Sequence, residues 1–231
     1  MIALIVIRPE PGCSATLRAA HDAGLQAHGF PMFAVEPVAW DAPPREAVDA
    51  VLIGSANALR HGGTALDTYR GLPAYVVGDA TAVAARAAGF AVAATGTGGL
   101  QAVLDGVRSS RLLRLGGRER IVLHPPAGVS IIERTVYASN PVPMPPELSA
   151  MLGKPAVVLL HSAEAARHFA AECDRLAIVR DGIALGVIGP RVAAAVGAGW
   201  AAVDCAEHPD DQALLALASR LCQTARQQGT G

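Results

Sequence analysis

The stretch that decides the fold is VLIGSANALRH, from Val51 to His61, because it occurs again as VLLHSAEAARH from Val158 to His168. In both copies a continuously apolar run ends in a serine, and an alanine-rich segment of helical period follows at once. A continuously apolar run is typical of a parallel strand buried on both faces. Each copy therefore predicts a buried strand leading directly into a helix, the building unit of a parallel α/β sheet.

The similarity continues past these two segments, as VVGDATAVAARAAGF in the first half and VIGPRVAAAVGAGW in the second. Their glycines, Gly78 and Gly189, follow the two repeated serines by 23 and 27 residues, as subtraction of the residue numbers gives. Two repeats are too few for a solenoid. The pattern therefore favours two similar parallel α/β lobes.

Two proline-rich stretches interrupt the alternation of strands and helices, Pro31–Pro44 and Asn140–Glu147. Proline fixes φ and supplies no amide donor, so such stretches cross between domains more readily than they lie in a sheet. Ordinary surface loops are the alternative. Elsewhere the periodicity predicts a helix over Ser14–Ala27 and strands over Ile121–Leu123 and Val129–Val136.

Composition excludes several classes of protein. The chain has 231 residues, a formal net charge of −1, 52% hydrophobic and 17% charged residues, which does not fit a disordered chain. Lys154 is the only lysine, and no uniform basic field exists for a nucleic-acid backbone. No apolar run approaches the roughly 18–20 residues of a membrane span. Met1–Arg8 reads as a strand with no signal peptide before it, so a cytoplasmic protein is expected.

Motifs for metal and nucleophilic chemistry are absent from the sequence. The cysteines form no C-x-x-C pair, and we expect reduced, mostly buried thiols at Cys13, Cys173, Cys205 and Cys222. His161 and His168 are seven residues apart, too far for an i, i+4 ligand pair. No G-x-S-x-G elbow and no phosphate-binding glycine motif occurs, which disfavours an esterase-type nucleophile and nucleotide binding.

The repeated serines are the candidate ligand-contacting residues. Ser55 and Ser162 are positioned as helix N-caps, and a helix N-terminus offers unpaired N–H groups and a partial positive charge to an anion. In an open parallel sheet the carboxyl ends of the strands line the ligand crevice. Simple capping is the alternative for each serine. The corners at Gly78 and Gly189 are of the same strand–turn–helix kind, and glycine allows a ligand close to the backbone.

Taken in order, several segments resemble the uroporphyrinogen-III synthase family over nearly the whole chain. The segments are Ile7-Arg8-Pro9, Gly54-Ser55-Ala56-Asn57-Ala58, the VGDATA stretch, Val136-Tyr137, Leu160-His161-Ser162-Ala163 and Ile188-Gly189-Pro190-Arg191. Two features depart from the family: Gly54 replaces a frequent threonine, and Leu115–Ser130 is short and lacks a helix that many members carry.

The resemblance implies an α/β fold of two flavodoxin-like parallel lobes joined by two crossovers. One lobe would comprise residues 1–36 and 140–231, and the other residues 37–139. It also implies an enzyme, a cyclising hydro-lyase, that needs no metal or organic cofactor. Family members close hydroxymethylbilane, a linear tetrapyrrole, to uroporphyrinogen III with loss of water and inversion of ring D, in the biosynthesis of haem and related tetrapyrroles.

Under this resemblance the catalytic candidate is Tyr137, which would donate a proton to the departing hydroxyl or orient a donating water. A half-buried structural tyrosine is the alternative, and surface ion pairs are the alternative for the arginines. The protein would hold the substrate folded between its lobes. The substrate-binding candidates are Arg8, Ser55, Ala56, Asn57, Gly78, Thr81, Ser162, Gly189, Pro190 and Arg191.

Two other functions remain open from the residues alone. The first is a non-enzymatic two-lobe binding module for a small polyanionic ligand. The second is a nucleotide- or flavin-dependent α/β enzyme, which would need a phosphate loop that the sequence lacks. For the synthase we expect a monomer with hydroxymethylbilane as its small-molecule partner, at most a transient contact with the preceding enzyme of the pathway, and no nucleic acid or membrane.

Overall fold

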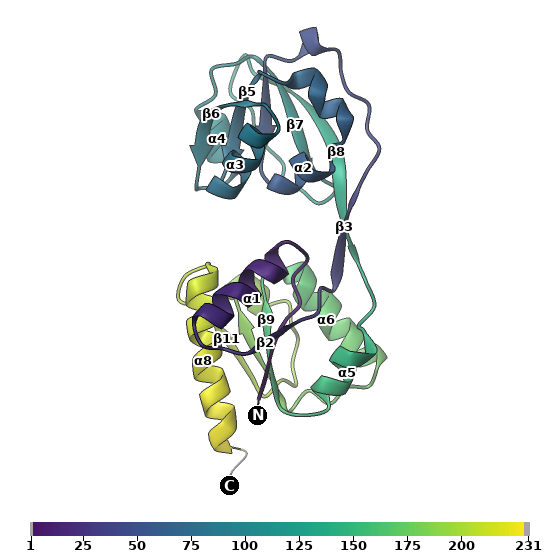
Figure 1. The fold of residues 1–231 in the computed structure, drawn as a ribbon, viewed down its shortest axis with the longest axis vertical. Coiled ribbons are helices and arrows are strands. Elements are labelled where there is room, and N and C mark those ends of the chain that lie inside the picture. Colours follow the sequence, from purple (N-terminus) through teal and green to yellow (C-terminus); the bar gives the residue numbers. More distant parts are fainter. Residues whose placement is uncertain (1, 229–231) are drawn as a thin grey trace. The chain divides into compact units, whose positions relative to one another are not determined.

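A computed structural model describes residues 2–228, and the chain divides into two compact units (Figure 1). Unit 1 comprises Met1–Ala34 and Pro141–Gly231, and unit 2 comprises Val35–Asn140. The sequence places the two changes of lobe after residues 36 and 139, and the structure places them after Ala34 and Asn140. Both chain ends belong to unit 1, so unit 2 is an insertion in it.

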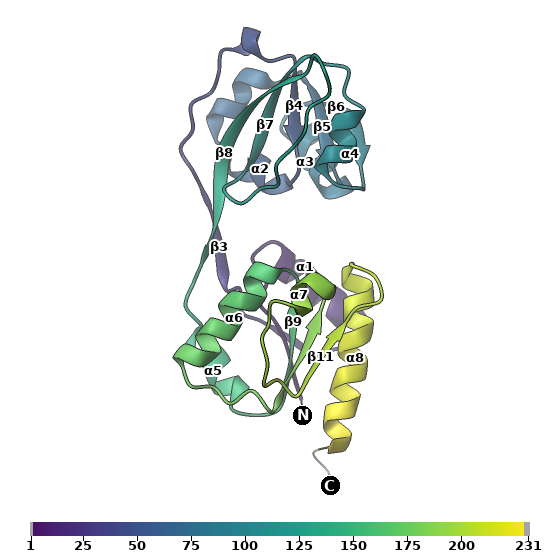
Figure 2. The ribbon, with the colours of Figure 1, turned by 180° about the vertical axis from the view of Figure 1, so that it is seen from behind.

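Unit 1 contains a five-stranded sheet in which every neighbouring pair is parallel. The strands are β1 (Ala3–Val6), β2 (Ala27–Gly29), β9 (Ala156–Leu160), β10 (Ile183–Val187) and β11 (Ala202–Cys205). Helices α1 (Gly12–Asp22) and α8 (Asp211–Gln228) cover one face, and α5 (Pro146–Leu152), α6 (Ala163–Arg175) and α7 (Pro190–Ala193) cover the other (Figure 2). Strands β1, β9 and β10 are buried between the two helical layers, as their unbroken apolar runs predict, whereas the edge strands β2 and β11 are partly or largely exposed.

Unit 2 contains a six-stranded sheet. The strands are β3 (Phe33–Pro37), β4 (Ala50–Ile53), β5 (Pro73–Val77), β6 (Ala91–Gly96), β7 (Arg111–Gly117) and β8 (Ser130–Pro141). Helices α2 (Ala56–His61) and α3 (Asp79–Ala87) pack on one face and α4 (Leu100–Asp105) on the other. Two short 3₁₀ helices, Arg45–Ala47 and Thr64–Tyr69, complete the unit.

The two sheets have the same strand order when β3 is set aside. Unit 2 reads β6-β5-β4-β7-β8 and unit 1 reads β11-β10-β9-β1-β2, so the repeated serine segments begin at the matching strands β4 and β9. Counted from the N-terminus of unit 1, this order is that of flavodoxin-like sheets. The predicted two-lobe parallel α/β fold is confirmed. The units differ by a circular permutation, because β7 and β8 follow the repeat whereas β1 and β2 precede it.

Three local predictions are wrong. The helix expected over Ser14–Ala27 ends at Asp22, because Gly24 takes a φ of +74° and turns the chain into β2. Ile121–Leu123 is a loop rather than a strand, since two of its three side chains face solvent. The first proline-rich stretch contains strand β3, which forms the sheet edge next to β8. An edge strand tolerates proline, so the stretch both enters unit 2 and pairs with it.

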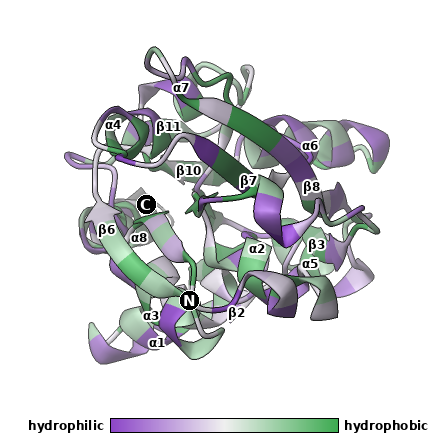
Figure 3. Cartoon of the chain, turned by 90° about the horizontal axis from the view of Figure 1, so that it is seen from above, coloured by the Kyte–Doolittle hydropathy of each residue, from purple (hydrophilic) through white to green (hydrophobic). Residues whose placement is uncertain are grey.

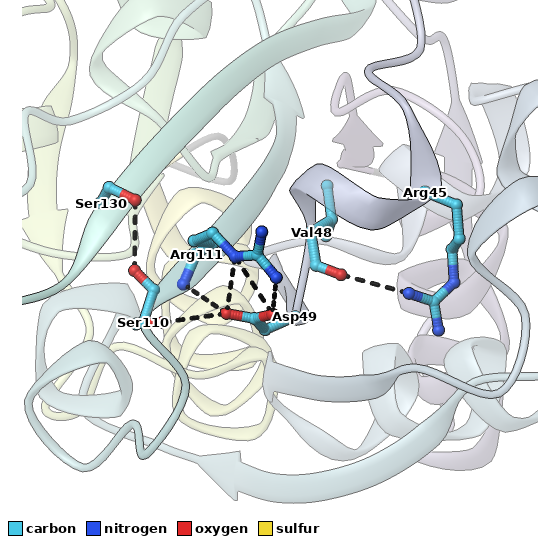
Figure 4. A network of polar contacts seen from close by, with 6 residues as sticks. All are labelled: Arg45, Val48, Asp49, Ser110, Arg111 and Ser130. Carbon is cyan, nitrogen blue, oxygen red and sulfur yellow. Dashed lines mark hydrogen bonds and ion pairs between the residues drawn. The ribbon is translucent and has the colours of Figure 1, made fainter.

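A polar network holds the amino ends of three unit 2 strands together (Figure 4). The carboxylate of Asp49 accepts hydrogen bonds from the backbone N–H of Arg111 and the hydroxyl of Ser110, both at 3.0 Å. The Ser130 hydroxyl donates to the carbonyl of Ser110 at 3.2 Å. The Arg111 guanidinium holds the pKa of the Asp49 carboxyl well below its usual range. The starts of β4, β7 and β8 are thereby fixed at the edge opposite the candidate site.

Helix α6 shows how the alanine-rich segments pack. It carries alternating hydrophobic and hydrophilic bands in Figure 3, and Phe169 and Cys173 on its inner side are fully buried. Burial raises the pKa of the Cys173 thiol to about 12 and that of the Cys13 thiol to about 11. Cys222 is buried as well and Cys205 is exposed, so the expectation of mostly buried cysteines is confirmed.

Candidate active site

The two repeated serines both cap helices. Ser55 accepts a hydrogen bond from the N–H of Asn57 at 3.2 Å, and Ser162 accepts one from the N–H of Ala165 at 3.1 Å. Both serines have extended backbone conformations, as N-cap residues require. The capping that the sequence suggests is confirmed, and it places the first turns of α2 and α6 at the carboxyl edges of their sheets.

Unit 2 has a cavity of about 320 Å³ at this edge. Both Ser55 and Tyr137 line it, together with the glycine-rich end of β7 and the loop that follows. Its lining residues are Gly54, Ser55, Val77, Gly99, Leu100, Arg114, Leu115, Gly116, Gly117, Glu119, Arg120, Ile121 and Tyr137. The cavity is the candidate active site, because it brings the predicted catalytic residue and a repeated serine to one space.

The other unit 2 candidates lie outside this lining. Ala56 is buried at the start of α2, and the side chain of Asn57 accepts a hydrogen bond from Arg60 at 3.0 Å. Gly78 precedes α3 with a φ of +78°, a conformation that L side chains rarely adopt. Thr81 is buried in α3. These residues shape the edge of the sheet rather than the wall of the cavity.

Tyr137 reaches the cavity from β8 because of a glycine on the neighbouring strand. A Cβ added to Gly117 would lie 2.8 Å from the Tyr137 ring, a distance that real Cβ atoms essentially never show. The two residues are register partners in the β7–β8 pair, next to an irregularity in the pairing. The ring of His61 lies 6.4 Å away, centre to centre. No hydrogen bond of the Tyr137 hydroxyl is found among residues 2–228, so the phenol is available to a ligand.

Two arginines in the cavity wall were missed by the sequence analysis. Arg114 lies in β7, and its Nη1 donates to Oε1 of Glu133 at 2.7 Å. Arg120 lies in the following loop, with its Nε 3.1 Å from Oε2 of Glu133. One carboxylate therefore holds two guanidinium groups. The signal was present in the sequence, since an arginine inside the run Leu112–Leu115 interrupts an otherwise apolar strand.

Unit 1 has its own cavity of about 440 Å³ at the carboxyl edge, and four predicted residues line it. Ser162 begins α6, and Gly189, Pro190 and Arg191 form the corner into α7. Arg191 is exposed there. The two corners of the second repeat therefore line one cavity.

Arg8, the remaining candidate, lies in an ionic cluster. Its Nη1 is 2.9 Å from Oδ1 of Asp211, and Thr16 donates to Oδ2 of the same carboxylate at 2.9 Å. The Nε2 atom of His161 lies 3.2 Å from Oδ1 of Asp211. Hydrogen bonding by His161, then by Thr16, and the charge of Arg8 lower the pKa of Asp211 to about 2. The charge of Arg8 is thus balanced within the protein.

The described residues contain no group of three or more His, Cys, Asp or Glu side chains placed to hold a metal ion. No helix described in the structure has both the length and the apolar character that crossing a membrane requires.

The family model described as uroporphyrinogen-III synthase HemD matches residues 14–216. The structure of uroporphyrinogen-III synthetase from Helicobacter pylori is similar, with a TM-score of 0.64 and 16% identity over 96% of this chain and 100% of that one. A mutant uroporphyrinogen III synthase from the extremely thermophilic bacterium Thermus thermophilus gives a TM-score of 0.50 and 18% identity over 97% and 100%.

Comparison with curated proteins gives no match. At these identities the solved structures show a shared fold, and the family model, which spans both units, shows descent. The chain belongs to the uroporphyrinogen-III synthase family.

Proposed function

We propose that this chain is a uroporphyrinogen-III synthase, a lyase that closes hydroxymethylbilane to uroporphyrinogen III with loss of water and inversion of ring D. The observation that carries the proposal is the family match over residues 14–216, which takes in the unit 2 cavity and both serine corners. The proposal includes a monomeric, cytoplasmic enzyme whose contact with the preceding enzyme of the pathway is at most transient. No observation favours the non-enzymatic binding module.

The proposed catalytic residue is Tyr137. Loss of the hydroxymethyl oxygen requires a proton at that oxygen, and the O–H of Tyr137 is a proton donor in the cavity wall. The cavity wall and the unengaged hydroxyl support this role, either as direct donor or through an ordered water. The electron pair of the broken C–O bond leaves with the oxygen, which departs as water, and the resulting azafulvenium cation is the electrophile that the terminal pyrrole attacks.

The substrate carries eight carboxylates, and the remaining candidates are proposed to hold them. In unit 2 these are Ser55, Ala56, Asn57, Gly78 and Thr81. In unit 1 they are Arg8, Ser162, Gly189, Pro190 and Arg191. Backbone N–H groups at helix starts bind carboxylates without reorganisation, and Pro190 contributes only its ring because it has no N–H. Holding the terminal pyrrole with its substituted carbon facing the azafulvenium cation supplies up to roughly 7–11 kcal/mol of barrier reduction.

The test is the isomer formed from freshly generated hydroxymethylbilane. After oxidation to porphyrins, chromatography separates the type III isomer, in which ring D is inverted, from the type I isomer of unassisted closure. We expect mainly type III with the purified protein and mainly type I in a matched reaction without it. A product that is type I alone in both reactions would contradict the proposal.

A further inference from the structure

Arg114 occupies a position where a charged residue is costly. Its side chain is 4% exposed, and its strand neighbours Leu113 and Leu115 are fully buried. The strand register identifies the matching residue in unit 1. Arg114 pairs with Leu52, which lies three residues before the capping serine Ser55. Val6 pairs with Leu159, which lies three residues before the capping serine Ser162. Val6 is therefore the unit 1 equivalent of Arg114. Burying a guanidinium here costs its hydration free energy, whereas the apolar Val6 fills the equivalent position in unit 1 without that cost. This difference points to a role of Arg114 in binding.

Glu133 compensates only part of the positive charge. Its carboxylate bridges Nη1 of Arg114 and Nε of Arg120, so two cations share one anion. The Nε of Arg114 is buried and has no hydrogen-bond partner among residues 2–228. Arg120 donates from Nη1 to the hydroxyl of Thr135 at 2.7 Å, which fixes its orientation. Glu133 thus holds the two guanidinium groups in place, and the buried Nε–H of Arg114 remains a hydrogen-bond donor without an acceptor in the described part of the chain.

Both arginines line the unit 2 cavity, on the wall that Ser55 and Tyr137 also form. The other charged residue of the lining, Glu119, is exposed, and no ion pair of its side chain is found in the described part of the chain. The carboxylate of Glu119 can rotate away from the cavity toward solvent, whereas the buried guanidinium of Arg114 is held in place on its strand. An entering anion would therefore meet fixed positive charge and one mobile negative charge.

We propose that Arg114 and Arg120, joined by Glu133, form a subsite that binds one carboxylate side chain of the substrate inside unit 2. The identity of that substrate rests on the proposed function, but the chemistry of the subsite does not. A planar guanidinium matches a carboxylate with paired N–H donors, and a partly dry wall strengthens such bonds. Arg120 contacts the carboxylate, and Arg114 places positive charge beneath it.

The first experiment detects the subsite without catalysis. Glutarate, a flexible dicarboxylate, is titrated into protein labelled with ¹⁵N at arginine, and the guanidinium resonances are followed by NMR. We expect saturable shifts of the Arg114 and Arg120 signals, lost in Arg120→Gln. Arg118→Gln is the matched control, because Arg118 lies two residues away on the same loop and outside the cavity lining. Absence of shifts at both arginines, or equal binding by Arg120→Gln, would overturn the proposal.

The second experiment uses steady-state kinetics with hydroxymethylbilane. Hydrogen bonds to charged groups are strong enough that Arg120→Gln should raise KM about tenfold while kcat stays within about twofold, since this bond is made before the chemical step. Arg118→Gln should leave both constants unchanged, and Glu119→Gln should lower KM about twofold by removing the competing negative charge. An unchanged KM in Arg120→Gln would overturn the subsite even if the wild type forms the type III isomer.

The two proposals therefore fail separately. A wild-type protein that yields only the type I isomer contradicts the synthase function, and the glutarate titration still decides the subsite. Thermal unfolding of each variant checks that the loop substitutions leave the fold intact, which their exposed positions favour.

Discussion

The carboxyl edges of the two sheets have the same strand order and the same capping serines, but their side chains differ at three matched positions. His161 and Gly54 each precede the capping serine. The strand register makes Val6 of unit 1 equivalent to Arg114 of unit 2. Two residues further along each chain, Arg8 of unit 1 is therefore equivalent to Gly116 of unit 2. Asp211 begins α8, which follows edge strand β11, and Leu100 begins α4, which follows the matching edge strand β6.

In unit 1 the three positions carry Arg8, His161 and Asp211, which contact one another in a polar cluster. Of these three, only His161 lines the unit 1 cavity. In unit 2 they carry Gly54, Gly116 and Leu100, all of which line the open cavity. The matched positions are thus tied together by polar contacts in unit 1, whereas in unit 2 they line the cavity. The repeat predicts the architecture, and the exceptions to the repeat locate the chemistry.

The largest effect is expected from removing the phenol of Tyr137, which lines the cavity of unit 2. Tyr137→Phe should reduce formation of the type III isomer about 100-fold, the range typical of a lost general acid, and should leave the urea midpoint near that of the wild type. Tyr75→Phe is the matched control, because Tyr75 is a buried unit 2 tyrosine outside the cavity lining. Equal turnover of Tyr137→Phe and wild type would remove Tyr137 from the mechanism.

A smaller loss is expected from giving unit 2 the arginine that unit 1 carries at the matched position. Gly116→Arg introduces the equivalent of Arg8, and the nearest atom to the new Cβ would be Cδ of Arg120 at 3.9 Å, an ordinary contact. The fold should therefore persist while the side chain occupies the cavity, and kcat/KM should fall about tenfold or more. Gly116→Ala, measured beside it, should retain activity. If Gly116→Arg retains full activity, the cavity is not the place where substrate binds.

The smallest effect concerns stability rather than activity. Asp211→Asn removes the charge that holds Arg8 and His161, and about 2 kcal/mol of unfolding free energy should be lost at pH 7, a value kept low because the Asp211 side chain is 34% exposed. The measurement is urea unfolding of the variant and the wild type.

The same substitution has a defined pH dependence. The pKa of Asp211 is lowered from 3.8 to about 2, so its contribution is complete above the unfolded-state value and is lost as pH falls toward 2. The difference in unfolding free energy between wild type and variant should therefore narrow between pH 4 and pH 2. A difference of constant size over that range would show that the carboxylate charge is not what stabilises the cluster.

Sequence reasoning succeeded where local patterns decide the structure. The buried strands and the serine caps follow from apolar runs and from residue chemistry within one turn. Strand β3 and helix α5 were missed because prolines mark both, although Pro146 fits the first turn of a helix and Pro37 the edge of a sheet. In each case tertiary context decides between loop and regular structure.

The candidate site was only partly predictable for a similar reason. Tyr137 and Ser55 came from motifs, whereas the pairing of Arg8 with Asp211 joins residues 203 positions apart and has no local signal. The role of Glu133 likewise depends on the register of β7 against β8, which neither strand specifies alone. The charge of Arg114 in an apolar run was visible, but its partner was not.

The insertion of unit 2 into unit 1 also sets an order of events during synthesis. Unit 2 is one continuous segment, Val35–Asn140, so it has its complete core as soon as that segment leaves the ribosome. Strand β1 lies inside the unit 1 sheet and waits for its neighbour β9, which begins at Ala156. At about 5–20 residues per second the delay exceeds several seconds. The hydrophobic strand β1 of the nascent chain is therefore in greatest need of protection from aggregation while β9 is still being translated.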